Sequence, residues 1–298
     1  MSILLSEEIL ESIKNELQNA ENSVQIITAY CKENIIAYLD KYINTNINNK
    51  RLLVRFRMND IVAGSTDFTI LEYCLKKGWK VYIRFDLHAK TYIVDNKRCI
   101  ISSANATNSG LNMGKMSNTE VGTLVELEPD DIVKIDNLFD NAIPVDDNIL
   151  QNLKKQIKNI IVKKETTIYH WDNTITDLFN PKIVTLFSHE LPESTQFKKG
   201  EYIPFLDVTY YGNNDILREK LRWSNAYLWL INVLKENNNE MFFGELSAKL
   251  HNIMVSDPMP LRKDIKIMLS NLLNIIEILQ MKELIIDKPN YSQRIRLK

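Results

Sequence analysis

Hydrophobic and polar positions follow two periods along the first 85 residues. Between Ser6 and Ala20, apolar residues recur with helical spacing at Ile9, Ile13 and Leu17, which predicts a helix that begins at Ser6. The apolar run 24–30 predicts a buried strand. Further helices are expected over 35–43 and 67–76, and further strands over 52–57 and 81–85. Strand–helix–strand units of this length predict a parallel or mixed sheet covered by helices.

After residue 88 the pattern becomes that of a hairpin. Strands are expected over 89–94 and 98–102, because Asp95-Asn96 between them is a favoured turn pair. A strand over 120–127, a helix over 130–141 and a last helix over 148–161 follow. We expect this domain to span residues 1–164.

The rest of the chain differs. Residues 165–215 mix short extended runs, 183–187 and 208–211, with prolines, and we expect a connecting segment there. Helices over 223–235, 243–251 and 261–281 precede strands over 284–287 and 293–297. Three helices followed by a hairpin resemble a winged helix-turn-helix, so residues 216–298 are expected to form a smaller, mostly helical domain of this kind.

Composition excludes some classes of protein. The 298 residues include 37 Lys and Arg against 38 Asp and Glu, so any nucleic-acid surface must be a local patch. No run approaches the roughly 18 apolar residues of a membrane span, and acids follow the N-terminus at once, unlike a signal peptide. Cys31, Cys74 and Cys99 lie in apolar runs and are expected to be buried thiols. We therefore expect a cytoplasmic protein that does not associate with membranes.

The most informative segment begins at His88. Alternate residues of a strand share a face, so His88 and Lys90 should lie together, and so should Ser103 and Asn105. The hairpin between them joins the two pairs. An imidazole, an ammonium, a hydroxyl and an amide suit an anionic oxygen substrate: Lys90 neutralises charge while the other two donate hydrogen bonds.

This segment resembles the phospholipase D superfamily, whose signature is H-x-K-x4-D followed after six residues by G-S-x-N. Five positions match that signature, and Ser102 stands where the family usually has glycine. The resemblance covers residues 1–164 and implies an α/β/α sandwich with a mixed sheet. The matching residues are His88, Lys90, Asp95, Ser103 and Asn105.

The resemblance also implies a mechanism. His88 would attack phosphorus and form a phosphohistidine, and a second histidine would protonate the leaving oxygen. The family needs two motifs per active site and this chain carries one, so a homodimer is expected in which each subunit gives His88, Lys90 and Asn105. Glu120 matches the acid that orients the nucleophile in single-motif nucleases. No metal ion and no cofactor are implied.

For several other residues a structural role has to be weighed against a functional one. Asp95 is expected to serve the hairpin turn, since Asp-Asn is a turn pair. Ser103 and Glu120 could be plain strand residues, although the site roles are favoured. The remaining histidines are expected at the surface or at an interface, and the spaced aromatics in the core. The histidines are His170, His189 and His251, and the aromatics are Tyr210, Tyr211, Trp223 and Trp229.

Several features favour nucleic acid as the substrate. A single motif resembles the bacterial nucleases and the phospholipase D-type restriction endonucleases, and residues 216–298 contain 13 Lys or Arg against 9 Asp or Glu. Basic residues that could contact DNA phosphates cluster at the start of the last helix and in the final hairpin. They are Arg262, Lys263 and Lys266 in the helix, and Arg294, Arg296 and Lys298 in a basic wing.

We therefore expect a dimeric, metal-independent DNA endonuclease of a restriction or defence system, with a further protein of such a complex as a possible partner. Two alternatives stay open. The protein could be a DNA-binding or complex-forming subunit whose phospholipase D-like domain is a scaffold or awaits activation by a partner. It could also be a phospholipid phosphodiesterase. A helical domain for dimerisation or partner docking is the alternative for residues 216–298.

Overall fold

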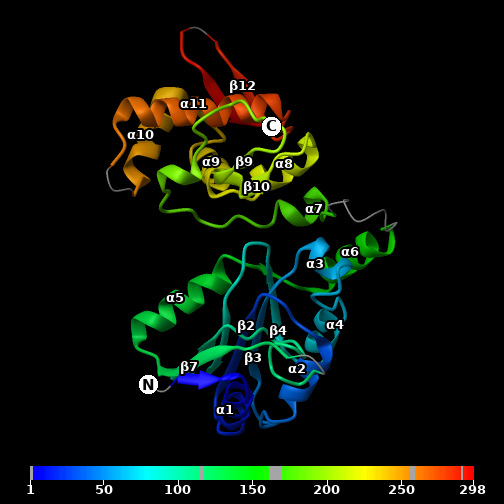
Figure 1. Cartoon of the computed structure of the whole chain (residues 1–298). Coiled ribbons are helices and arrows are strands. Elements are labelled where there is room, and N and C mark those ends of the chain that lie inside the picture. Colours follow the sequence, from blue (N-terminus) through cyan, green and yellow to red (C-terminus); the bar gives the residue numbers. More distant parts are fainter. Residues whose placement is uncertain (1–2, 115–116, 161–168, 256–258, 290) are drawn as a thin grey trace. The chain divides into compact units, whose positions relative to one another are not determined.

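The computed structural model describes the chain except for residues 1–2, 115–116, 161–168, 256–258 and 290 (Figure 1). Its contacts divide the chain into two compact units, Met1–Phe179 and Asn180–Lys298. Among the described residues, no helix is long and apolar enough to cross a membrane.

The first unit is built on one mixed sheet. Its strands lie in the order β1-β7-β6-β5-β2-β3-β4-β8; the pairs β2–β3 and β3–β4 are parallel, and all the others are antiparallel. The strands are β1 (Ile3–Leu5), β2 (Ser23–Thr28), β3 (Asn49–Arg55), β4 (Lys80–Arg84), β5 (Lys90–Val94), β6 (Arg98–Ser102), β7 (Val121–Glu126) and β8 (Ile143–Pro144). The helices are α1 (Ser6–Gln18), α2 (Glu33–Asp40), α3 (Met58–Val62), α4 (Ile70–Lys76), α5 (Pro129–Asp140), α6 (Asp147–Lys158) and α7 (Asn173–Thr176).

Helices cover both faces of this sheet. Figure 1 shows α5 on one side and α2 and α4 on the other. Phe139 of α5 packs against Ile27, Leu53 and Ile93, which alternate with residues of the opposite face. Helix α1 buries its three periodic apolar residues and contacts β5, β6 and β7. The predicted α/β/α sandwich with a mixed sheet is confirmed.

The predicted hairpin is present. Strands β5 and β6 pair antiparallel, and the turn residues Asp95 and Asn96 have φ angles of 55° and 53°. Asn and Asp tolerate this left-handed conformation, which the two-residue turn requires. Strands β1 and β8 were not predicted. They have three and two residues, respectively, and such short segments show no recognisable alternation of apolar and polar residues.

The second unit has the element order and strand pairing of a winged helix. Helix α9 is followed by β11, two helices and a hairpin, and the strands lie antiparallel in the order β11-β13-β12. The elements are η1 (Ser188–Glu190), β9 (Tyr202–Ile203), η2 (Pro204–Leu206), β10 (Val208–Thr209), α8 (Asn214–Arg222), α9 (Asn225–Glu236), β11 (Glu240–Phe242), α10 (Phe243–Ile253), α11 (Arg262–Ile278), β12 (Leu284–Asp287) and β13 (Arg294–Leu297).

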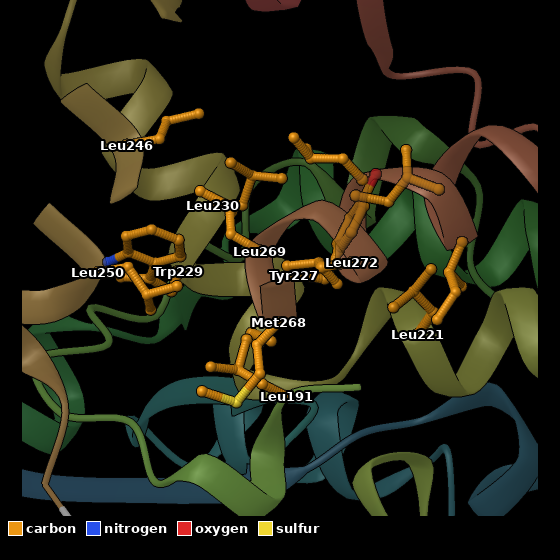
Figure 2. Packing of buried hydrophobic residues seen from close by; sticks show 14 of the residues in the cluster. Leu191, Leu221, Tyr227, Trp229, Leu230, Leu246, Leu250, Met268, Leu269 and Leu272 are labelled. Carbon is orange, nitrogen blue, oxygen red and sulfur yellow. The ribbon is translucent and has the colours of Figure 1, made fainter. Parts of the chain in front are cut away.

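A separate hydrophobic core holds the second unit together. Figure 2 shows Trp229 and Leu230 of α9 close to Leu250 of α10 and Leu269 of α11. Trp229 is 1% exposed, as its core-like spacing predicted. The same expectation is wrong for Tyr211, which is 71% exposed and directly precedes a glycine with positive φ in a turn.

The units divide at residue 179 rather than at 164 and 215. Trp171 stacks on Phe56 with ring centroids 5.8 Å apart, and its Nε1 donates a hydrogen bond of 2.6 Å to the Phe56 carbonyl. Residues 171–179 therefore pack into the first unit. Leu191 and Leu206 are buried in the core of the second unit, so much of the expected connecting segment belongs to that unit. The expected boundary at Lys164 lies outside the described residues.

The remaining sequence expectations concern single residues. The three cysteines are buried free thiols, as expected. His170 and His189 are exposed, also as expected, whereas His251 is half-buried. Trp223 and Tyr210 are half-buried, and Tyr210 packs at the edge of the second core.

Candidate active site

His88 and Lys90 lie together where the chain enters β5. His88 sits in the connection from β4 and its side chain is exposed, whereas Lys90 is the first residue of β5 and is buried. The Lys90 Nζ donates a hydrogen bond of 2.7 Å to the His88 carbonyl and lies 3.1 Å from Nδ1 and 3.3 Å from Nε2 of the ring. The same-face pairing predicted from their spacing is therefore present.

The charge of Lys90 controls the protonation of this imidazole. The adjacent ammonium lowers the pKa of His88, and burial and the charges of Arg55 and Arg57 act in the same direction. Burial and Arg55 also lower the pKa of Lys90, while Glu120 opposes them. The lowered pKa of His88 favours the neutral imidazole, whose ring-nitrogen lone pair can act as a nucleophile.

Asn105 is held in one orientation by the backbone just after β2, the strand next to β5. Its Oδ1 accepts a hydrogen bond of 2.9 Å from the Tyr30 N–H. Because a backbone N–H can only donate, the amide oxygen faces it and the Nδ2 group is left to donate to an anion. Thr28, which pairs with Lys90 across β2 and β5, lies 3.5 Å from the same oxygen through its hydroxyl.

A glycine permits the loop to close over Asn105. A Cβ atom at Gly110 would lie 2.5 Å from the Asn105 carbonyl oxygen and 2.9 Å from its backbone nitrogen. No side chain can approach backbone this closely, so the loop after the motif requires glycine at this position.

Ser103 and Glu120 bind each other rather than the other site residues. The Ser103 hydroxyl donates to Glu120 Oε2 and accepts a hydrogen bond of 3.1 Å from the Val121 N–H. Glu120 is buried, and its Oε1 accepts a hydrogen bond of 3.0 Å from the Asn118 side-chain amide.

These bonds differ from the expected roles. In the part of the chain that the structure describes, no hydrogen bond joins Glu120 to His88, because the carboxylate turns toward the strand that carries Ser103. The Ser103 proton is committed to Glu120, so the hydroxyl must leave this partner before it can donate to a substrate oxygen.

Asp95 has the structural role that its turn position predicted. Its carboxylate accepts hydrogen bonds from the backbone N–H groups of Glu21, Asn22 and Ser23 at 2.9, 2.6 and 2.8 Å. Burial disfavours ionisation of this carboxyl, but the three donors together outweigh it and lower the pKa of Asp95. Asp95, the aspartate of the motif, thus ties the hairpin turn to the start of β2.

Ser102, which replaces the usual glycine of the motif, faces a glycine on the neighbouring strand. Ser102 and Gly122 are direct partners in the β6–β7 ladder. A Cβ atom at Gly122 would lie 2.9 Å from the Ser102 Cβ and 3.0 Å from the Ile101 carbonyl oxygen. The two strands can therefore lie close together at this rung, because Gly122 on β7 has no side chain to meet that of Ser102.

Arg55 and Tyr30 also lie at the site, although neither belongs to the sequence motif. Arg55 ends the parallel strand β3, places its guanidinium carbon 4.5 Å from the centre of the Tyr30 ring, and forms a bidentate ion pair with Asp60 at 2.8 and 3.0 Å. Tyr30 in turn holds Asn105. Their position beyond the carboxyl ends of parallel strands, where α/β proteins gather site residues, is the signal that could have found them.

The basic residues of the second unit fall into two groups. Arg262, Lys263 and Lys266 are exposed on the first turns of α11. Arg294 and Arg296 instead pair with Asp287 across the hairpin. Nε and Nη2 of Arg294 each lie 2.9 Å from a carboxylate oxygen of Asp287, and Nη2 of Arg296 lies 2.8 Å from one.

The expected basic wing is therefore largely neutralised within the sheet. Hydrogen bonds from Arg294 and, after the opposing effect of burial, from Arg296 lower the pKa of Asp287 to about 2. Lys298 is exposed at the end of the chain, outside the hairpin turn. That Arg294, Arg296 and Lys298 contact DNA phosphates stays a prediction, and the two arginines already bind Asp287 in this structure.

Candidate metal ligands are dispersed. Over residues 3–114, 117–160, 169–255, 259–289 and 291–298, no three His, Cys, Asp or Glu side chains gather closely enough to hold a metal ion.

Part of the chain is similar to known proteins. The family model described as "Cardiolipin synthase, PLD-like domain" matches residues 13–143. Among solved structures, NucT from Helicobacter pylori is 16% identical (TM-score 0.36), with 48% of this chain and 98% of that chain covered. Nuc from Salmonella typhimurium, a phospholipase D family member, is 14% identical (TM-score 0.38), with 48% and 97% covered.

Phosphatidylserine synthase from Haemophilus influenzae Rd KW20 is 15% identical (TM-score 0.37), and the match covers 53% of this chain and 45% of that chain. No curated protein sequence matches the chain. The matched segment contains strands β2 to β7 of the mixed sheet together with His88, Lys90, Ser103, Asn105 and Glu120. Residues 13–143, within the N-terminal unit, thus match a PLD-like domain of the phospholipase D superfamily.

Proposed function

We propose that this protein is a metal-independent phosphodiesterase that cleaves DNA, with His88 as the nucleophile. The observation that carries the proposal is an exposed imidazole in contact with the buried ammonium of Lys90, which lowers the pKa of His88. The Asn105 amide is held nearby with its nitrogen free to donate. Nucleophile, positive charge and neutral donor are the parts that a phosphoryl transfer needs.

The reaction proceeds in two displacements. A ring nitrogen of His88 attacks phosphorus, the bond to the leaving oxygen breaks, and a phosphohistidine forms while Lys90 and Asn105 hold the non-bridging oxygens. A second histidine gives its proton to the leaving oxygen. That histidine then takes a proton from water, which attacks phosphorus, releases the phosphate product and restores His88.

The second histidine is His88 of another copy of the chain. The sequence carries the motif once, and an exposed apolar patch next to the site supports self-association. Ile3, Leu5, Ile101 and Val121 are 74, 56, 47 and 52% exposed. They lie on one face of neighbouring strands, because Leu5 pairs with Val121 and Ile101 shares a rung with Thr123 and Ile3.

This patch reaches the catalytic residues directly. The Ser103 N–H donates a hydrogen bond of 2.9 Å to the Val121 carbonyl. Contiguous exposed aliphatic side chains on a monomer mark interaction surfaces. A two-fold contact here would bring two copies of the site together.

The second unit supports DNA as the substrate. A winged helix is a frame for DNA recognition, and α11 exposes Arg262, Lys263 and Lys266, which can contact phosphates. This unit would select the target, as a restriction or defence nuclease requires. The family model takes its description from cardiolipin synthase, so phospholipid cleavage is the competing function.

Cleavage assays test the proposal. Supercoiled plasmid is incubated with the wild-type chain, His88→Ala and the control His189→Ala, an exposed histidine of the second unit, with EDTA throughout. We expect cutting by the wild type and the control but not by His88→Ala. Full activity of His88→Ala would refute the mechanism. Hydrolysis of phosphatidylglycerol vesicles without plasmid cutting would favour the lipid function.

A further inference from the structure

A hollow lies between α10 and α11, the last two helices of the winged-helix unit. It has a volume of about 240 Å³. Helix α10 contributes one stripe of residues and α11 contributes its first turns. The hollow is lined by Gly244, Ser247, Ala248, His251, Asn252, Arg262, Ile265 and Lys266.

Helical spacing explains how the hollow forms. Gly244, Ser247, Ala248 and His251 recur every three to four residues and so share one face of α10. Three of these side chains are small, which leaves space between the helices. A Cβ atom added to Gly244 would have no atom within 4 Å, so this space is open rather than packed.

The rim of this hollow is cationic. Arg262 and Lys266, at positions one and five of α11, are exposed, and the half-buried His251 faces them across the space. Among the residues that line it, none is acidic. The arginines of β13 differ, because they form ion pairs with Asp287 and Glu240. Arg262 and Lys266 thus keep their charge for an external anion.

We propose that this hollow binds a backbone phosphate of duplex DNA, held by Arg262 and Lys266 with His251 as a third contact. The inference rests on the proposed nuclease function and identifies how its second unit anchors the substrate. Phosphate contacts fix the register of a protein on DNA without reading sequence. Ser247 and Asn252 supply neutral hydrogen-bonding groups beside the cations.

Gly244 offers a test that leaves the cations in place. Gly244→Glu puts a carboxylate into the open space, whereas Gly244→Ala adds only a methyl group and should slightly stabilise the helix. Both variants are made in the full chain carrying His88→Ala, so that DNA is not cut. Binding to a fluorescent 20-base-pair duplex is measured by anisotropy from 50 to 300 mM salt, and circular dichroism checks folding.

We expect Gly244→Glu to bind the duplex at least tenfold more weakly than Gly244→Ala. The double variant Arg262→Gln, Lys266→Gln should lower the slope of log affinity against log salt by about 1, since the hollow binds one phosphate and each neutralised phosphate contributes about 0.9. Lys249→Gln, on α10 outside the hollow, is the control and should lose less than twofold.

Equal affinity of Gly244→Glu and Gly244→Ala would overturn the inference, as would duplex binding without salt dependence or no duplex binding at all. If Gly244→Glu is unfolded, the double variant decides, and an unchanged salt slope would overturn the inference. Plasmid cutting by the unmodified chain is a separate readout. Cutting combined with unaltered binding by the variants would leave the nuclease proposal intact and remove only the phosphate anchor.

Discussion

Asp95 provides a strong test of whether a signature residue of this site is chemical or structural. Replacing it with Ala removes the acceptor of three backbone N–H groups, at 2.6–2.9 Å, on the segment that enters β2. A hydrogen bond to a charged group contributes about 1.5–3 kcal/mol when water cannot replace it. Two of these bonds are solvent-exposed, so we count them at about half that value.

The expected loss for Asp95→Ala is therefore about 3–6 kcal/mol in the free energy of unfolding of the first unit. Asp95→Asn keeps a neutral acceptor and should lose about 1–2 kcal/mol. Urea unfolding followed by circular dichroism measures both values. The control is Asp140→Asn, an exposed residue at the end of α5, which should change stability by less than about 0.5 kcal/mol.

The pH dependence supplies a second readout. Because the pKa of Asp95 is lowered in the folded state, its stabilising effect is complete above the pKa of the unfolded chain, near 4. The effect disappears as pH falls through the lower pKa of the folded state. The stability difference between wild type and Asp95→Asn should accordingly shrink below pH 4.

Catalysis distinguishes the two roles. At a temperature where Asp95→Asn is folded, we expect its plasmid-cutting rate to stay within threefold of wild type. A hundredfold loss of rate with unchanged stability would show that Asp95 takes part in the chemistry, and the structural reasoning would be refuted.

Three further changes have expected outcomes. Lys90→Met removes the ammonium beside the ring, so the pKa of His88 should rise in an NMR titration; an unchanged titration would contradict the charge effect. Asn105→Asp keeps an acceptor for the Tyr30 N–H but loses the donor, so cleavage should fall at least hundredfold while thermal stability changes little; retained activity would contradict this. Trp229→Ala should cost about 3–5 kcal/mol. We expect differential scanning calorimetry to show this loss only in the second unit's transition.

Local signals in the sequence predicted the centre of the fold and of the site. The Asp95-Asn96 turn and the alternation on either side fix the hairpin within one residue, and the hairpin alone brings Lys90 close to the segment of Ser103. Such features depend on residues close in sequence. The motif spacing could therefore be translated into geometry without a structure.

Features set by distant residues were not predictable in the same way. Ser103 binds Glu120 across 17 positions, through a loop that the pattern does not describe. Strand β1 is recognisable only once β7 is present to pair with it. The charge of Arg294 was counted, but Asp287 becomes its partner only when the register of the last hairpin is known.

The rung formed by Ser102 and Gly122 bears on how relatives of this chain can be recognised. Two side chains cannot stand there together without a shift in the strands, whereas a glycine on either strand relieves the contact between them. A lineage could then replace the glycine of the motif only after its partner strand had acquired one. A pattern search that demands glycine in the motif itself would reject the descendants, and one that accepts it at either position of the rung would retain them.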